Sequence, residues 1–310
     1  MPSTEWWTEP SVAPSSRRAP AVGTMDTMSD NSAIAVRGLR KSYGTTNAVD
    51  GLDLTVQRGE VFALLGPNGA GKTTTVEILE GYRRRDAGDV SVLGVDPREA
   101  SMDWRSRIGI VLQSTGEFED LTVGEVVGHF AHYFPNPDDP VKVIERVGLG
   151  EKRDKKAKTL SGGQQRRLDV ALGILGRPEL LFLDEPTTGF DPAARREFWE
   201  LVRDLAAAGT TILLTTHYLD EAEALANRVG VIARGRLVEV STPAALGGRN
   251  TAQATVRWHG PDGPRAMATD TPTKLVAELA TQFGGEIPEL VISRPTLEDI
   301  YLTMIGGDDK

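Results

Sequence analysis

The sequence has no cysteine among its 310 residues, and this absence excludes disulfide bonds and thiolate chemistry. It also has no uninterrupted apolar run near the roughly 20 residues that span a bilayer, so we expect that the chain does not cross a membrane itself. Basic residues do not outnumber acidic ones, 35 against 44, which gives a formal net charge of −9. This balance argues against nucleic acid as a partner, because a phosphate backbone is bound by a surplus of positive charge.

What is present is the composition of a globular protein, with 39% apolar and 25% charged residues. The length suits one large domain or two smaller ones. Residues 1–33 are the exception, because they are rich in Ser, Thr, Pro and Ala and show no apolar periodicity; we predict a disordered N-terminal tail. Their composition raises the hypothesis that translation starts at Met25 or Met28, which an intact mass with Met1 or Pro2 at the native terminus would refute.

Ordered structure is expected from Ile34. Segments 34–39 and 52–56 alternate apolar and polar residues, which predicts half-buried antiparallel strands. Between them, Tyr43 precedes Gly44 at a turn. An aromatic ring at this place either stacks on an adenine or packs against the small sheet, and the spacing alone does not choose between the two.

A continuous apolar run at 61–65 predicts a strand buried on both faces of a parallel sheet. It leads directly into a match to G-x-x-x-x-G-K-[ST] and then into a helix predicted from Thr74 to Leu79. In this pattern backbone N–H groups wrap phosphates, Lys72 reaches the β- and γ-phosphates, and the Thr73 hydroxyl ligates Mg²⁺. The predicted nucleotide-binding residues of this stretch are Gly66, Pro67, Asn68, Gly69, Ala70, Gly71, Lys72, Thr73 and Thr74. The basic triplet that follows, 83–85, is interpreted as a solvated helix end.

Three more predicted buried strands end in polar residues. Gln113 follows the strand at 107–112, Asp184-Glu185 follow the run at 180–183, and His217 follows the strand at 211–216. Because the carboxyl ends of parallel strands form the ligand-binding edge of such sheets, these side chains are expected to converge on the P-loop. A glutamine at this place can reach a metal ion or the attacking water, or it is a polar loop residue only.

The residues from about 114 to 165 change character and predict a helical insertion. Thr122 and Glu125 form a capping box, and helices are predicted at 126–134 and 141–147. His129 and His132 lie three positions apart, but no third ligand is near, so metal binding is not expected.

The stretch Ser161-Gly162-Gly163-Gln164 opens the next predicted helix. Ser161 and Gln164 satisfy the Ser-x-x-Gln capping box, and the glycines leave N–H groups free at the positive end of the helix dipole. This is the chemistry of a phosphate site. Apolar residues at 168, 171, 172 and 175 predict that one face of this helix is buried.

The C-terminal part is predicted to contain a hairpin at 229–240, followed by a small appendage. The appendage shows a strand at 254–258, a Gly/Pro/Asp loop, an amphipathic helix through 276–283, a strand at 290–293 and a final helix through 297–304. The whole pattern predicts an α/β fold: a P-loop NTPase (RecA-like) core at 34–246 with an antiparallel β subdomain and the helical insertion, plus an α+β appendage at 247–310.

The ordered set of motifs resembles the ATP-binding subunits of ABC transporters, from Tyr43 in the A-loop position through the P-loop to His217 in the switch position. The resemblance implies ATP and Mg²⁺, with Asp184 holding the ion mostly through water and Glu185 as the general base. It implies that His217 contacts the γ-phosphate and that Gln113 serves both metal and water. It also implies that residues 161–164 and Asp191 close on a nucleotide held by a second ATPase subunit, most simply in a homodimer.

Residues 294–302, Arg-Pro-Thr-Leu-Glu-Asp-Ile-Tyr-Leu, are similar to the ending of daunorubicin-resistance (antibiotic-resistance) subunits of ABC-2 exporters. This similarity implies an ATPase that is peripheral at the cytoplasmic face of the membrane and drives a separately encoded transmembrane permease. Export of lipid, polysaccharide or sodium stays open, because the cargo is not readable here. A non-transport ABC ATPase of translation or DNA repair is disfavoured by the single P-loop and the lack of heptads. A purely regulatory nucleotide switch would not need Glu185.

Overall fold

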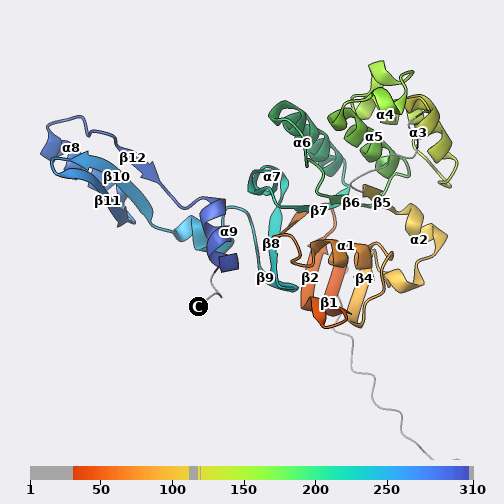
Figure 1. Ribbon diagram of the computed structural model, residues 1–310, viewed down its shortest axis with the longest axis horizontal. Helices are drawn as coiled ribbons and strands as arrows, with labels where there is room; N and C mark the ends of the chain where they lie inside the picture. Colours follow the sequence, from red (N-terminus) through yellow and green to blue (C-terminus); the bar gives the residue numbers. More distant parts are fainter. Residues whose placement is uncertain (1–30, 112–117, 119, 307–310) are drawn as a thin grey trace, which may run out of the picture. The chain divides into compact units, whose positions relative to one another are not determined.

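The structure is a computed structural model that describes residues 31–111, 118 and 120–306. Within these residues the strands form three sheets (Figure 1). The N-terminal tail, apart from its last three residues, lies outside the described residues. Strand β1 begins at Ser32, two residues before the predicted start of order at Ile34.

The central sheet has six strands in the order β5-β6-β7-β3-β8-β9. The first five are parallel, and β9 runs antiparallel to β8 as the predicted hairpin. Every residue of β3 and β7 is buried. This agrees with the sequence prediction of strands that are covered on both faces of the sheet. The strands are β3 (Val61–Leu65), β5 (Ile108–Val111), β6 (Leu180–Asp184), β7 (Thr211–Thr216), β8 (Arg228–Ala233) and β9 (Arg236–Ser241).

Two hydrophobic cores lie on the two faces of this sheet. Ala63 and Leu65 of β3 belong to one core, and Phe62 and Leu64 belong to the other, because successive side chains of a strand point to opposite faces. The helices connected to the strands of this sheet are α1 (Lys72–Leu79), α2 (Met102–Ser106), α5 (Gly162–Ile174), α6 (Pro192–Ala207) and α7 (Leu219–Leu225).

The smaller antiparallel sheet has the order β2-β1-β4, with β1 at Ser32–Tyr43, β2 at Thr46–Gln57 and β4 at Ala87–Val92. The β1–β2 hairpin turns at Tyr43, which pairs with Thr46. The apolar residues of this sheet share a core with one face of the central sheet. Strand β4 has no counterpart among the predicted elements, since its sequence contains both glycine and aspartate.

The helical insertion contains α3 (Val123–Ala131) and α4 (Pro140–Arg146), followed by short 3₁₀ segments η3 (Gly150–Lys152) and η4 (Ala157–Thr159). Helix α3 begins three residues before the predicted 126–134, because both hydrogen bonds of the Thr122–Glu125 capping box are formed. It also ends three residues early.

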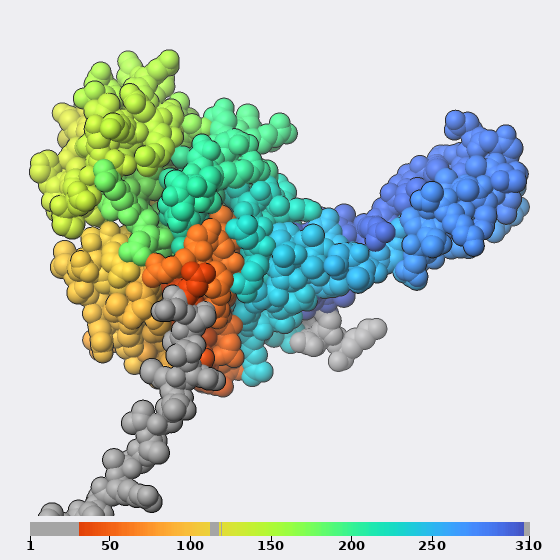
Figure 2. All heavy atoms as spheres, turned by 180° about the vertical axis from the view of Figure 1, so that it is seen from behind, coloured from red at the N-terminus to blue at the C-terminus, as the bar shows by residue number. Residues whose placement is uncertain are grey.

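The C-terminal segment forms η5 (Leu246–Thr251), β10 (Ala254–Gly260), β11 (Gly263–Thr269), α8 (Pro272–Phe283), β12 (Val291–Ser293) and α9 (Leu297–Gly306). The sheet of this segment has the order β11-β10-β12. The atoms of the segment are coloured in shades of blue in Figure 2. Val256, Trp258 and Leu279 share a small core there, whereas Leu297 and Tyr301 of α9 belong to a core of the central sheet. The prediction of a loop after 258 is wrong for β11, which pairs with β10 along its whole length. No helix in the described ranges combines the length and the apolar character of a bilayer span.

Candidate active site

The P-loop connects β3 to α1 and lies directly against backbone from two other elements. Gly71 caps the helix at φ 105°, and a Cβ there would come within 2.3 Å of the Ala48 carbonyl oxygen. Gly235, in the β8–β9 turn at φ 76°, would bring a Cβ within 2.9 Å of the same oxygen, and its N–H donates to the Ala70 carbonyl. Only residues without a Cβ permit this approach, so the loop is held by main chain on two sides.

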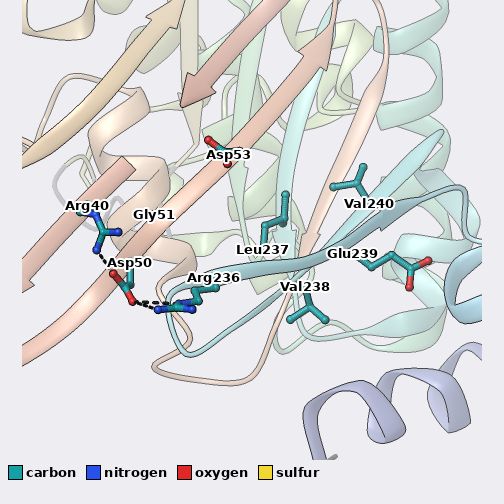
Figure 3. A pocket seen from close by; sticks show the side chains of 9 residues that line it. All are labelled: Arg40, Asp50, Gly51, Asp53, Arg236, Leu237, Val238, Glu239 and Val240. Carbon is teal, nitrogen blue, oxygen red and sulfur yellow. Dashed lines mark hydrogen bonds and ion pairs between the residues drawn. The ribbon is translucent and has the colours of Figure 1, made fainter. Parts of the chain in front are cut away.

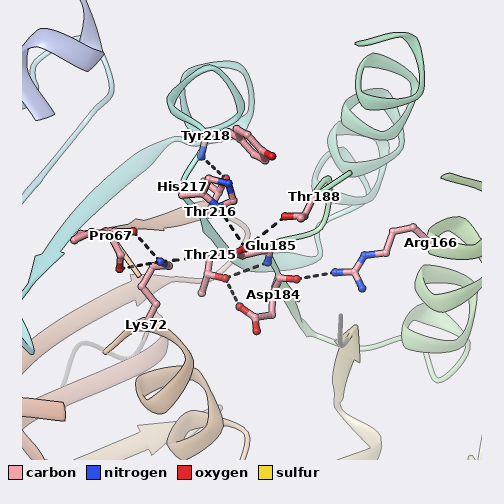
Figure 4. A network of polar contacts seen from close by, with 11 residues as sticks. Pro67, Lys72, Arg166, Asp184, Glu185, Thr188, Thr215, Thr216, His217 and Tyr218 are labelled. Atoms are coloured by element: carbon pink, nitrogen blue, oxygen red, sulfur yellow. Dashed lines mark hydrogen bonds and ion pairs between the residues drawn. The ribbon is translucent and has the colours of Figure 1, made fainter. Parts of the chain in front are cut away.

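Lys72 is buried at the start of α1, which begins two residues before the predicted Thr74. Its Nζ donates to the Gly66 carbonyl at 2.7 Å and to the Pro67 carbonyl at 3.3 Å (Figure 4). Burial lowers the pKa of Lys72, and the negative charges of Glu185 and Asp184 oppose that shift. Its cation is therefore aimed at the centre of the loop, where phosphate oxygens bind in this motif.

Asp184 ends β6 and is held from two sides by residues that the sequence analysis did not single out. The Thr215 hydroxyl of the neighbouring strand β7 donates to Asp184 Oδ1. The buried Arg166 of α5 donates from Nη2 to the Asp184 carbonyl at 2.7 Å and from Nε to the Pro186 carbonyl at 3.1 Å. These contacts fix both the carboxylate and the backbone after β6 (Figure 4).

Glu185 occupies a backbone conformation that non-glycine residues rarely adopt, with φ 43°. Its N–H donates to the Thr215 carbonyl oxygen at 3.1 Å, which stabilises this turn. The carboxylate lies between two cationic or titratable groups: Oε1 is 3.8 Å from Lys72 Nζ, and Oε2 is 3.3 Å from His217 Nδ1. The structure thus brings together the P-loop lysine, the acidic pair and the histidine from three separate strands (Figure 4).

The segment at 161–164 begins α5 with both hydrogen bonds of the capping box formed between Ser161 and Gln164. Ser161 and Gly162 are exposed at the helix start, and the Ser161 N–H donates to Gln164 Oε1 at 3.1 Å. The apolar face predicted for α5 is buried at Leu168, Ala171 and Leu175. Asp169 and Val170 are buried as well, because the helix packs against both the insertion and the central sheet.

Asp191 caps α6 by accepting hydrogen bonds from the N–H groups of Ala193 and Ala194, both at 2.9 Å. An acid at this end of a helix is favourable to the helix dipole. Within this chain, the Asp191 carboxylate serves as the N-terminal cap of α6. Its predicted contact with a nucleotide on a second subunit stays a proposal.

Tyr43 is 43% exposed at the end of β1. Lys41 Nζ lies 5.5 Å and Arg83 Cζ lies 5.3 Å from the centre of its ring. The ring is therefore accessible, although cations already approach it. The interpretation of 83–85 as a solvated end is wrong for Arg85, which is buried and makes a bidentate ion pair with Asp96.

The remaining candidates do not add to this site. His129 contacts Tyr133, and His132 contacts the Gly128 carbonyl; within the described ranges no three His, Asp or Glu side chains group as a metal site. Gln113 lies outside the described residues, beyond the end of β5.

A groove between β2 and β9 is also visible (Figure 3). Asp50 pairs there with Arg40 and Arg236, and the lining includes none of the predicted site residues. Both of its arginines are already paired with Asp50, so it does not compete with the strand ends as the active site.

A parallel sheet that delivers a P-loop, an acidic pair and a histidine to one edge is the architecture of the P-loop nucleoside triphosphatases, and this chain has it. A sequence model of the family described as "ABC transporter" matches residues 49–188. The daunorubicin/doxorubicin resistance ATP-binding protein DrrA of Streptomyces peucetius is 38% identical, over 90% of this chain and 94% of that protein. The Nod factor export ATP-binding protein I of Burkholderia lata is 41% identical, over 89% and 97%.

Among solved structures, cbiO1 from Clostridium perfringens, part of the ABC transporter complex cbiONQ, has a TM-score of 0.64 and 30% identity. The alignment covers 69% of this chain and 90% of that one. The chain belongs to the family of ABC transporter ATP-binding proteins, and the predicted resemblance is confirmed. It is an ATPase that binds and hydrolyses ATP, and subunits of this kind work with a transmembrane permease and dimerise.

Proposed function

We propose that this chain drives a membrane exporter of drugs or antibiotics by ATP-dependent dimerisation. The observation that carries the proposal is the extent of the likeness to DrrA, 90% of this chain, because it reaches beyond the ATPase region into the C-terminal segment. The domain arrangement that fits this role is an ATPase at 34–246, with its helical subdomain at about 114–165, and an accessory domain at 247–310.

We assign the roles at the site from the contacts of each residue. Lys72 binds the β- and γ-phosphates, since its ammonium is held by carbonyl oxygens of the loop itself. Glu185 accepts a proton from the attacking water, and His217, 3.3 Å from its carboxylate, contacts the γ-phosphate and orients that water. Tyr43 provides the exposed ring on which adenine stacks.

The residues present suit Mg²⁺. The Thr73 hydroxyl is exposed, and the Asp184 carboxylate is oriented by Thr215, so both offer the oxygen ligands that this ion prefers. Few protein ligands are needed, because Mg²⁺ in such sites keeps waters and takes substrate phosphates. When bound, the ion neutralises charge on the phosphate oxygens. Gln113, from its place after β5, is assigned to the same ion.

The partners we propose are a second copy of the chain and a separately encoded permease. Residues 161–164 and Asp191 of one copy would contact the nucleotide on the P-loop of the other. A chain of this kind acts peripherally at the cytoplasmic face of the membrane. Its net charge of −9 gives nucleic acid no favourable surface.

A second cargo class is favoured by a specific observation. The Burkholderia lata relative, whose name is that of a Nod factor exporter, is slightly more identical to this chain than DrrA is, 41% against 38%. Export of a Nod factor is therefore the alternative to export of a drug.

The test is to tag the C-terminus, fractionate native membranes in mild detergent and identify the proteins that co-purify by mass spectrometry. A stoichiometric polytopic partner supports the exporter, and transport of daunorubicin or of a lipo-oligosaccharide by the reconstituted pair decides between the cargo classes. Recovery outside the membrane fraction, with ribosomes, DNA or no partner, would overturn the transport role and leave the ATPase.

A further inference from the structure

Glu221 is a buried acid for which the roles assigned above have no use. It lies in the first turn of α7, four residues after His217, and its side chain is fully shielded from solvent. Burial of a carboxyl is unfavourable unless hydrogen bonds compensate it, so its neighbours indicate what keeps it there.

The neighbours of the Glu221 carboxyl come from three elements of the site. Trp199 of α6 donates from Nε1 to Oε1 at 3.4 Å. The hydroxyls of Thr216, which directly precedes His217, and of Thr187, two residues after Glu185, are its other hydrogen-bonding neighbours. The carboxyl therefore lies between the segment that carries the histidine and the turn that follows the general base.

The contact with Thr187 is close but not well aligned. Within the described part of the chain, neither Glu221 Oε2 nor Thr187 Oγ1 makes a hydrogen bond of good geometry, and both atoms are buried. Thr216 is held more firmly, since its Oγ1 also accepts a hydrogen bond from the Tyr218 N–H at 2.9 Å.

The surrounding charges agree with a polar bridge and not with an ion pair. Burial raises the pKa of Glu221, and the hydroxyls and the Trp199 indole offset part of that rise. Arg195 also favours the charged form, but its Nη1 is 3.0 Å from Asp220 Oδ2 and its guanidinium stacks 4.6 Å from the Tyr218 ring centre. The Thr187 hydroxyl can both donate and accept, so it can pair with the Glu221 carboxyl once the two groups are aligned.

We propose that Glu221 is a positioning residue that bridges Thr187 and Thr216 and so keeps Glu185 and His217 in register for hydrolysis. The side chain is buried away from the strand-end carboxylates, and it acts by joining the segment that follows Glu185 to the segment that carries His217. This inference rests on the roles proposed for Glu185 and His217.

The test compares four single variants of the full chain, one double variant and one control with wild type. Glu221→Gln keeps size and hydrogen bonding, Glu221→Leu keeps size only, Thr187→Val removes the hydroxyl, and His217→Ala tests the premise. Glu200→Ala is the matched control, because Glu200 is an exposed acid on α6 that pairs with Arg203. ATP turnover, KM for ATP, binding of a fluorescent ATP analogue and thermal unfolding are measured for each.

We expect Glu221→Leu to lower kcat at least about tenfold while KM and analogue binding change less than about twofold, because misplacement of reacting groups affects turnover before binding. Glu221→Gln should stay within about threefold of wild type, since its amide can donate to Thr187. Thr187→Val should lower kcat, and the Glu221→Leu/Thr187→Val double variant should be no worse than Glu221→Leu alone.

Several results would overturn the inference. The inference is wrong if Glu221→Leu keeps the wild-type kcat, or if it loses kcat and analogue binding equally. It is also wrong if Glu221→Gln is as impaired as Glu221→Leu. If Glu221→Leu fails to fold, Thr187→Val decides the matter alone, and unchanged kcat in it overturns the bridge. Unchanged kcat in His217→Ala would refute the assigned role of the histidine itself, whereas loss in His217→Ala without loss in the other variants would refute only the bridge.

Discussion

The carboxylate of Glu185 is placed by its neighbours rather than by its own flexibility. Its left-handed backbone turn and its hydrogen bond to Thr215 direct Oε1 toward Lys72 and Oε2 toward His217. A residue held in such a conformation at a strand end is a frequent feature of functional sites, where the surrounding fold compensates for the strain.

Glu185→Gln is therefore expected to keep the fold and lose the base. Hydrolysis should fall at least about a hundredfold, because an amide cannot accept the proton of the attacking water. With ATP bound and not consumed, the variant should elute as a dimer in size-exclusion chromatography, and phosphate release should be measured on the same sample. A variant that stays monomeric and hydrolyses ATP normally would contradict both assignments.

Lys72→Ala should weaken nucleotide binding before it affects folding. The ammonium contributes charge-assisted hydrogen bonds of about 1.5–3 kcal/mol, which corresponds to roughly 10- to 150-fold in Kd for ATP. Removal also relieves the burial of a cation whose pKa is already lowered by desolvation, so the melting temperature should change little. Titration with a fluorescent ATP analogue and a thermal melt separate the two effects. A large drop in melting temperature with unchanged Kd would be the opposite of this expectation.

At this scale the sequence predicted the residues that carry charge or begin a motif, but not those that orient them. In the sequence, Thr215 is recognisable only as a polar residue at the end of an apolar strand. Arg166 is recognisable only as a basic residue inside a helix. Each acquires its role from a contact with β6 that is remote along the chain. Glu221 was hidden in the same way, because nothing in the sequence pattern of α7 distinguishes it from its exposed acidic neighbours.

The elements that hold the site are joined by contacts that permit no added atoms. Strand β5 approaches α5 at Gly109, where a Cβ would lie 2.2 Å from the Gly173 carbonyl oxygen. Because this oxygen belongs to backbone, the clash can be relieved only by moving the strand or the helix. The spacing between β5, which leads to Gln113, and α5, which begins at Ser161, depends on this contact.

Gly109→Ala should lower the free energy of unfolding by about 1–3 kcal/mol, as overpacking does in close-packed interiors. Gly128→Ala is the matched control: it lies in the middle of α3 with no atom within 4 Å of the added Cβ, so it should raise stability by about 0.5–1 kcal/mol. Urea unfolding of both variants, followed by tryptophan fluorescence, gives the comparison. Equal effects of the two substitutions would show that the close approach of β5 to α5 is not what limits position 109.

The ion pair between Arg85 and Asp96 links the end of the α1 segment to the turn after β4, and it should make stability depend on pH. Arg85 lowers the pKa of the Asp96 carboxyl from 3.8 to about 2. A pKa that is lower in the folded state gives a contribution that is complete above the unfolded pKa, near 4, and is lost as the pH falls toward about 2.

Asp96→Asn should accordingly reduce the free energy of unfolding at pH 7 by at most about 2 kcal/mol. The difference between wild type and variant should shrink steadily below about pH 4, because the carboxyl of the unfolded chain takes up a proton there while that of the folded chain stays ionised until about pH 2. Urea titrations at pH 7, 4 and 3 measure it. A difference that is constant over this range would mean that the charge of Asp96 is not involved.

Elements were predicted best where a pattern repeats and worst where it does not. The buried strands β3, β6 and β7 were predicted from their apolar runs, whereas their order along the sheet comes from the structure. The residues of β11 show no alternation and are largely exposed, so the sequence predicted a loop there. Only the pairing with β10 makes this segment a strand.

At the scale of the whole molecule, we propose that each working ATPase site is shared between two chains. Gly162 offers a way to test it without disturbing the fold. It is exposed, a Cβ there meets nothing within 4 Å, and an acid at the first position of α5 is favourable to the helix dipole. Gly162→Asp should thus fold normally while it repels the phosphates of a nucleotide on the opposite chain.

Mixing this variant with Lys72→Ala should restore part of the activity that each has lost. One of the two sites in a mixed dimer combines the intact P-loop of the Gly162→Asp chain with the intact helix start of the Lys72→Ala chain. ATPase activity is measured at constant total protein while the ratio of the two variants is varied. Activity that never exceeds that of the separate variants would indicate that each chain completes its own site.

At the scale of the whole molecule, the sequence predicted some properties and left others open. The family and the nucleotide followed from motifs, which are local in the sequence. The cargo and the permease did not follow from any motif, because the permease that we propose is a separate chain.

The contact among Gly71, Gly235 and Ala48 has a consequence for inherited variation. Two backbone segments meet the same carbonyl oxygen with no room for a methyl group, and both glycines have positive φ. Every missense codon at 71 or 235 therefore introduces the same obstacle, whatever side chain it encodes. In a saturation library selected for resistance in living cells, these two positions should be depleted uniformly across the nineteen alternatives, whereas neighbouring Asn68, an exposed residue of the loop, should tolerate a graded set.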